Sequence, residues 1–126
     1  AASDVYKRQL GTECPALFCN NSDTAKQLML IGEKINDPIW HLPLFAPYER
    51  YLKTATSAIS STGQSGYGGA ITAALFLQKF IGKELNWAHI DVMAWNLSSR
   101  PGRPKGGEAM GLRAVYQYIA KLSKNH

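Results

Sequence analysis

The stretch that decides the fold is GQSGYGGAITAALFLQKFIGKELNWAHIDVM, residues 63–93. A glycine-rich turn at residues 63–69 leads directly into residues 70–81, which are apolar on almost every side and predict a buried helix. Gly82 ends the helical pattern, and residues 87–93 then form the clearest strand of the chain. A turn, a buried helix and a strand in this order indicate an α/β fold.

The residues before this stretch predict a second strand and helix. Residues 14–19 form a short apolar run that is compatible with a strand, and the capping side chains of residues 20–23 indicate that a helix starts there. Apolar residues then recur at helical spacing as far as Asp37, which precedes a proline and therefore disfavours the helical region. Weaker patterns predict a short helix at residues 48–52 and a strand at residues 54–61.

The residues after the stretch predict a loop and a terminal helix. Residues 100–107 have the composition of a loop. An amphipathic helix comes next, marked by Leu112, Val115, Tyr116, Ile119 and Leu122. Because strands and helices alternate, we predict a layered, largely parallel sheet with helices on both faces. Ligands of such sheets bind beyond the carboxyl ends of the strands, so the residues after Asp91 are a candidate site.

Length and composition limit the class of protein. The chain has 126 residues, enough for one domain, with 45% hydrophobic residues, 18% charged residues and a formal net charge of +5. No apolar run approaches the roughly 20 residues of a membrane span, and the N-terminus lacks an apolar stretch of the signal-peptide type. The two cysteines, Cys14 and Cys19, build no disulfide framework, so we predict a soluble, reduced protein without a membrane partner.

The glycine-rich turn opens a helix, so its free backbone N–H groups could hold an anion. It lacks the Lys-Ser/Thr ending of a P-loop and the glycine spacing of the dinucleotide fingerprint. Ser65 also misses the esterase elbow, because Tyr67 stands where the closing glycine belongs. We favour a structural role, a tight turn with close helix packing. A small anion-binding or nucleotide-binding module remains the alternative function.

His89 and Asp91 alternate on one face of their strand and could form an acid–base or ligand pair. The other histidines, His41 and His126, have no close metal-ligand spacing to His89 or to the cysteines. We therefore favour the interpretation that His89 is a hydrogen-bonded structural histidine. These residues on their own give an incomplete active site.

Only Arg100, Arg103 and Lys105 form a local basic cluster, and the other basic residues are spread along the chain. A basic adaptor or RNA-binding domain would depend on this cluster. No basic face interleaved with aromatic residues and no nucleic-acid-binding module is visible, so we expect no nucleic-acid partner.

Several runs resemble the leucyl aminopeptidase family in their order and spacing. They are LG at residues 10–11, PALF at 15–18, DPIWHLPL at 37–44, GAITAALFL at 69–77 and WAHID at 87–91. The later run RPGRPKGGEA, residues 100–109, is similar to a bacterial branch of the family. Together the runs span nearly everything after residue 9.

The resemblance implies that residues 10–126 are the C-terminal portion of the catalytic domain, a layered α/β domain of the zinc-exopeptidase type. The family removes N-terminal amino acids from peptide substrates with two divalent metal ions, zinc or manganese, in a cytoplasmic homohexamer. Its Asn-Thr-Asp-Ala-Glu-Gly-Arg motif, which binds metal and supplies an arginine for catalysis, is absent here. We therefore expect no catalytic and no metal-ligating residue in this chain, and no activity of the chain alone.

The resemblance also implies a pocket for the N-terminal side chain of the substrate just past the WAHID strand. Carried over to this sequence, the substrate-binding positions are Met93 and Asn96. Met93 offers a flexible apolar wall, whereas Asn96 puts an amide where an apolar group would suit leucine better. The alternative is that both residues merely continue the strand and its turn.

Residues 1–9 carry no periodic pattern and join abruptly to the patterned residues after them. Residues 4–9, DVYKRQ, resemble translated sequencing-adapter sequence. We predict that residues 1–9 are a non-native or disordered tail, with a flexible natural terminus as the alternative.

Overall fold

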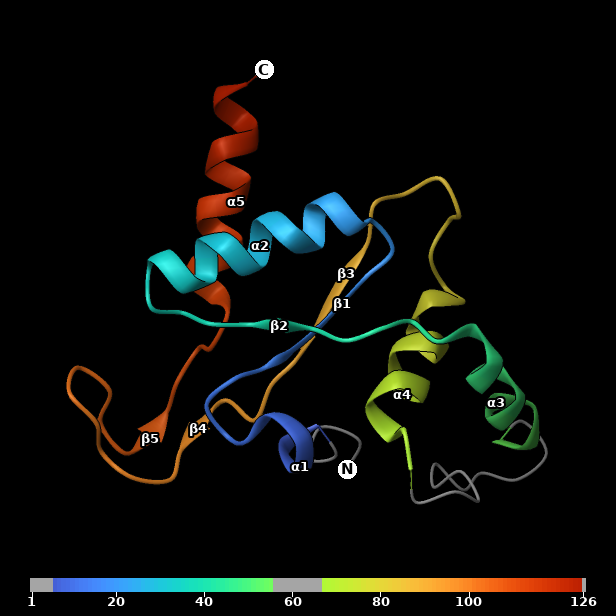
Figure 1. Ribbon diagram of the computed structural model, residues 1–126, viewed down its shortest axis with the longest axis horizontal. Coiled ribbons are helices and arrows are strands. Elements are labelled where there is room, and N and C mark those ends of the chain that lie inside the picture. Colours follow the sequence, from blue (N-terminus) through green and yellow to red (C-terminus); the bar gives the residue numbers. More distant parts are fainter. Residues whose placement is uncertain (1–5, 56–66, 126) are drawn as a thin grey trace.

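The computed structural model describes residues 6–55 and 67–125, and Figure 1 shows how their helices and strands are arranged. In chain order the elements are α1 (Lys7–Leu10), β1 (Ala16–Cys19), α2 (Ser22–Lys34), β2 (Trp40–His41), η2 (Ala46–Glu49), α3 (Arg50–Ala55), α4 (Gly69–Gln78), β3 (Ala88–Asp91), β4 (Trp95–Asn96), β5 (Gly106–Gly107) and α5 (Leu112–Lys124). Helices and strands are mixed along the chain, which confirms the predicted α/β class.

β1 is the central strand of the main sheet, whose order is β2-β1-β3. It pairs in parallel with β2, where Ala16 lies opposite Trp40, and antiparallel with β3, where Ala16 lies opposite Asp91. β4 and β5 form a separate antiparallel pair. The expectation of a largely parallel sheet is therefore corrected: β1 has one parallel and one antiparallel neighbour.

The antiparallel pairing of β3 results from contacts at the end of β1. The Asn20 side chain accepts a hydrogen bond from Trp87 N at 2.8 Å and donates one to Leu85 O at 2.8 Å. Asn20 N also donates to Trp87 O at 3.2 Å. These bonds hold residues 85–87 beside the C-terminal end of β1. The next residues, which form β3, therefore run antiparallel to β1.

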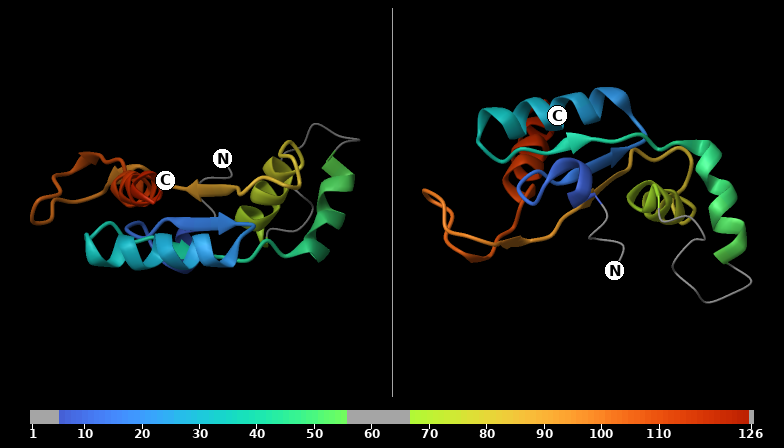
Figure 2. Two further views of the ribbon diagram at one scale, coloured as in Figure 1. Left: turned by 90° about the horizontal axis from the view of Figure 1, so that it is seen from above. Right: turned by 60° about the horizontal axis from the view of Figure 1, so that its bottom comes forward.

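Helices cover both faces of the main sheet, as predicted. On the face that we call the α2/α5 face, the buried cluster consists of Leu17, Cys19, Ala25, Leu28, Ile39 and Ala114. On the opposite face, the α4 face, it consists of Tyr6, Ala16, Phe18, Ala70 and Ala74. Figure 1 shows α2 crossing α5 at one end of the molecule and α4 beside α3 at the other, and Figure 2 shows the same separation from two further directions.

α2 begins where the sequence predicts. Asn21 Oδ1 accepts a hydrogen bond from Thr24 N at 2.9 Å and so caps the helix N-terminus. Near the other end, Gly32 allows the chain to fold back closely, because a Cβ at this position would lie 2.6 Å from the carbonyl oxygen of Asp37. The helix ends at Lys34, shortly before the predicted stop.

The predicted burial of residues 70–81 is only partly right. α4 buries Ala70 and Ala74 against the sheet, and its Leu75 is buried as well. Its other side is exposed: 49% of Phe76 and 73% of Phe80, which comes just after the helix, remain accessible. The sequence is apolar on almost every side, but the described chain contacts α4 through the sheet, η2 and α3 and leaves the side of Phe76 open.

The predicted terminal helix is confirmed as α5, but most of its apolar stripe is exposed. Of the five apolar positions that mark the helix, only Val115 packs against the α2/α5 cluster. Ala114 and Tyr118 occupy the interface with α2 instead, and Tyr118 Oη lies 3.2 Å from Thr24 Oγ1. The remaining predicted positions are exposed; they are Leu112, Tyr116, Ile119 and Leu122.

The weaker predictions have mixed outcomes. The short helix expected at residues 48–52 is confirmed by η2 and α3. The strand expected at residues 54–61 is wrong for its first two residues, which continue α3, and its other residues lie outside the described part of the chain. Within the segment 1–9, residues 7–9 belong to α1, and Tyr6 is buried on the α4 face.

Candidate functional site

The candidate site is the turn after β3. Ala94 has a φ of 56°, a left-handed conformation that a residue other than glycine rarely adopts. The turn is held from two sides, since Ala94 O accepts a hydrogen bond from Glu108 N at 3.0 Å and Met93 N donates one to Tyr6 Oη at 2.6 Å. Backbone conformations of this kind persist where the surroundings fix them, and they are enriched at functional sites.

Met93, the first sequence-predicted site residue, is half-buried. Its side chain packs against the apolar cluster of the α4 face. The side chain therefore contributes to the apolar core of the α4 face.

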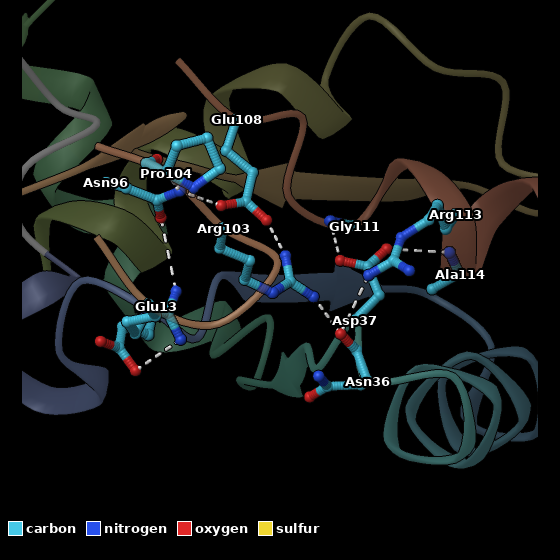
Figure 3. Close-up of polar contacts among 11 residues, drawn as sticks. Glu13, Asn36, Asp37, Asn96, Arg103, Pro104, Glu108, Gly111, Arg113 and Ala114 are labelled. Carbon is cyan, nitrogen blue, oxygen red and sulfur yellow. Dashed lines mark hydrogen bonds and ion pairs between the residues drawn. The ribbon is translucent and has the colours of Figure 1, made fainter. Parts of the chain in front are cut away.

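Asn96, the second predicted site residue, is buried in β4 with its amide fully engaged (Figure 3). Its Nδ2 donates to Pro104 O at 3.0 Å and to a carboxylate oxygen of Glu108, and its Oδ1 accepts from Arg100 Nη2 at 3.4 Å. The structure thus directs Met93 and Asn96 into different clusters and does not bring their side chains together.

The predicted basic cluster is largely used inside the chain. Arg100 pairs with Glu13 at 3.0 Å. Arg103 pairs with Glu108 and donates to Asn36 O, as Figure 3 shows. A cavity of about 180 Å³ lies beside these groups; its lining residues are Glu13, Asn36, Asp37, Pro38, Arg100, Arg103 and Met110. The acidic partners were not identified from the sequence, because they lie far from the arginines or across a loop.

Asp37 is the most deeply enclosed of these charged side chains, with 2% of its surface exposed. Its two carboxylate oxygens accept hydrogen bonds from Gly111 N at 2.9 Å and Ala114 N at 3.0 Å (Figure 3). It therefore caps the N-terminus of α5, whose own N-cap residue, Gly111, has no side chain to do so. The sequence indicated this residue only as the stop of the preceding helix.

His89 and Asp91 do lie together on β3, but His89 is enclosed by rings. Its imidazole stacks between Phe18 and Trp87, at centroid distances of 6.1 and 6.3 Å. Burial lowers the pKa of His89, and the negative charge of Asp91 opposes part of that shift. These ring contacts favour a structural role for His89 through aromatic packing, whereas the hydrogen bond that the sequence predicted is not among the contacts of the described residues.

The remaining candidates have structural surroundings as well. Cys14 and Cys19 are free thiols, as predicted; Cys19 is buried, and burial raises the pKa of Cys14. His41 lies on β2, and its Nε2 is buried without a hydrogen-bond partner among the described residues.

Only residues 67–69 of the glycine-rich turn fall in the described part of the chain. Gly68 is left-handed, with a φ of 65°, and a Cβ there would lie 2.9 Å from the Tyr48 ring. The turn therefore needs glycine for conformation and for close packing, which supports the structural role over the anion-binding one.

Among residues 6–55 and 67–125, no three His, Cys, Asp or Glu side chains are grouped in a way that could hold a metal ion. The donor sets found here therefore do not fit the two metals that the resemblance implies. No helix of this part is long and apolar enough to cross a membrane.

Comparison with known proteins identifies relatives of the chain. The sequence model of the cytosol aminopeptidase family, catalytic domain, matches residues 3–116. The cytosol aminopeptidase of Buchnera aphidicola subsp. Acyrthosiphon pisum (strain APS) is 41% identical over 116 residues, which are 90% of this chain and 22% of that protein.

Solved structures agree with this match. The crystal structure of the cytosol aminopeptidase from Coxiella burnetii is 48% identical, with a TM-score of 0.82, and the match covers 96% of this chain and 26% of that one. The bottromycin maturation enzyme BotP in complex with Mn is 30% identical, with a TM-score of 0.82, over 95% of this chain and 27% of that one.

This chain thus spans about a quarter of the length of the relatives that it matches. The shared fold confirms the type of domain that the resemblance implied. Because the family match extends over most of the sequence, the chain belongs to the cytosol aminopeptidase family, within its catalytic domain.

Proposed function

We propose that residues 10–126 form the C-terminal portion of the catalytic domain of a metal-dependent aminopeptidase, which as a whole removes N-terminal amino acids from peptides. The observation that carries the proposal is the 48% identity and TM-score of 0.82 to the Coxiella burnetii aminopeptidase over 96% of this chain. Because the match covers 26% of that protein, most of the enzyme lies outside these residues.

We propose that the chain alone has no peptidase activity. The described residues offer no group of metal-binding side chains. Two divalent ions, zinc or manganese, would supply an activated water and polarise the scissile carbonyl in the complete enzyme. The manganese in BotP supports a divalent ion in this family. The metal ligands would come from the part of the domain outside this chain.

The contribution of this chain to substrate recognition would be the turn after β3. Met93 would supply a flexible apolar wall for the N-terminal side chain of the substrate. Asn96 would act on the pocket indirectly, because its buried amide is already bonded to Pro104 and Glu108 and so holds the end of the turn in place. The left-handed Ala94 between them supports a functional reason for the geometry of the turn.

The complete enzyme would be cytoplasmic and would assemble as a homohexamer. The names of the relatives, cytosol aminopeptidases, support the first statement. The second depends on the family resemblance of the sequence.

Two measurements test the proposed function. The purified chain, incubated with a chromogenic leucine substrate and manganese, should release product only at the background rate. A chimeric Coxiella burnetii aminopeptidase, in which this chain replaces the matching quarter, should regain metal-dependent turnover. Turnover by the chain alone would contradict the proposed inactivity, and a folded but inactive chimera would contradict the proposed activity.

A further inference from the structure

α4 carries an exposed apolar face, and the helix itself has no charged residue. The segment Gly69–Gln78 contains no acidic or basic side chain. Three large apolar side chains face outward at its C-terminal end, with exposed fractions of 49% for Phe76, 39% for Leu77 and 73% for Phe80. Phe76 and Phe80 form an edge-to-face pair with centroids 5.2 Å apart, so they present one aromatic surface.

The other long helices differ from α4 in this respect. α2 carries Asp23 and Lys26, and α5 carries Arg113 and Lys121, so each has a charged side, although α5 also exposes apolar side chains. A helix that is apolar on all sides is normally enclosed inside a large domain, whereas an amphipathic helix lies at a surface. The composition of α4 is therefore that of an enclosed helix, although in the described chain its Phe76 and Leu77 remain exposed.

The lengths of the relatives indicate what covers the other side. The chain shares its fold with the Coxiella burnetii aminopeptidase over 96% of its length, yet it represents 26% of that protein. About three quarters of such a protein are therefore available to pack around this portion.

We propose that the outward face of α4, formed by Phe76, Leu77 and Phe80, is the docking surface for the part of the aminopeptidase polypeptide outside this chain. That part presents an apolar surface to Phe76, Leu77 and Phe80, since these three side chains offer no partner to a charged group. This inference rests on the proposed function, according to which the chain is a portion of a longer enzyme.

The test compares one substitution in two settings, the chain alone and the chimeric aminopeptidase. Phe76→Glu removes an exposed apolar group from the chain alone, so the soluble yield of the chain should rise. In the chimera the same glutamate is buried without a partner, so the soluble yield should fall several-fold and the thermal midpoint should drop by more than about 5 °C. Gln117→Glu, on the polar side of α5, is the matched control. It should change neither the soluble yield of the chain nor the yield and thermal midpoint of the chimera.

The opposite signs distinguish the proposal from its competitors. Equal effects of Phe76→Glu in both settings would overturn it, because the face would then be covered within this chain. A second copy of the chain would be the occupant if the chain alone were a dimer that Phe76→Glu converts to a monomer, while the same substitution left the soluble yield and thermal midpoint of the chimera unchanged. An unsubstituted chimera that does not fold would also contradict docking. Activity is not the readout, so an inactive chimera would affect the proposed function alone.

Discussion

The two faces of the main sheet differ in how completely this chain covers them. On the α2/α5 face, two helices cross, and the polar groups between them are paired, as Thr24 is with Tyr118 and Asp37 with α5. On the α4 face, the helix covers Ala16 and Phe18 but leaves its own outer side exposed. The difference teaches that this chain closes the core between α2, α5 and the sheet, although α5 leaves its outer apolar side chains exposed, whereas it leaves the apolar outer side of α4 open. Substitutions of the same kind should therefore have unequal effects on the two faces.

The largest effect is expected from Leu28→Ala on the α2/α5 face. Leu28 is 3% exposed and packs in the cluster with Leu17 and Ile39. Truncation should lower the free energy of unfolding by about 2–5 kcal/mol, the range for a leucine in a closed core. Chemical denaturation of the chain, monitored by circular dichroism, measures the change. Leu30→Ala, in the same helix at 59% exposure, should stay within about 0.5 kcal/mol; equal losses at both positions would show that this face is not closed.

A somewhat smaller loss is expected from Asp37→Ala. Gly111 N and Ala114 N would remain buried without acceptors, and α5 would lose its cap, at a cost of about 2–3 kcal/mol. Asp23→Ala removes an exposed acid from the first turn of α2 and should cost at most about 1 kcal/mol. If the two variants unfold at the same denaturant concentration, the Asp37 carboxylate does not join α5 to the core.

Local patterns account for what the sequence could predict. The cap at Asn21, the apolar run of β1 and the WAHID strand are each determined by residues close in sequence, and all three are confirmed. The α/β class was predicted from their order.

Long-range contacts account for what the sequence could not predict. Asn20 binds residues 85–87, and Asp37 caps a helix that begins 75 residues later, at Leu112. Neither partner can be chosen from spacing or periodicity. The exposure of Phe76 was missed for a different reason. The sequence shows that a helix is apolar, but it does not show whether other residues of the same chain pack against each of its sides.

A third, smaller effect is expected from Asn20→Ala. This substitution tests the contact that holds β3 beside β1, in the sheet that separates the two faces. The variant loses the hydrogen bonds to Leu85 O and from Trp87 N at an exposed site, with an expected cost of about 1 kcal/mol. Hydrogen exchange should show faster opening of Ala88–Asp91 than of α2. Uniform acceleration across both would mean that Asn20 supports the whole fold and does not hold β3 in particular.

The smallest effect concerns pH and arises on the α4 face. Burial between Phe18 and Trp87 lowers the pKa of His89 below its usual value of about 6.5, and Asp91 counteracts part of this. Because the folded-state pKa is the lower one, the unfolded chain binds more protons between the two values. The contribution of neutral His89 to stability is therefore complete above about pH 6.5 and is lost as the pH falls through the folded-state pKa.

His89→Phe isolates this contribution, because phenylalanine keeps an aromatic ring between Phe18 and Trp87 but cannot titrate. The free energy of unfolding, measured from pH 5 to pH 8, should rise less steeply with pH in the variant than in the unsubstituted chain. Carboxylates titrate in both proteins, so the difference between the two slopes belongs to His89. Identical slopes would mean that the imidazole is as well solvated in the folded chain as in the unfolded one, and the α4 face would then be open as far as β3 itself.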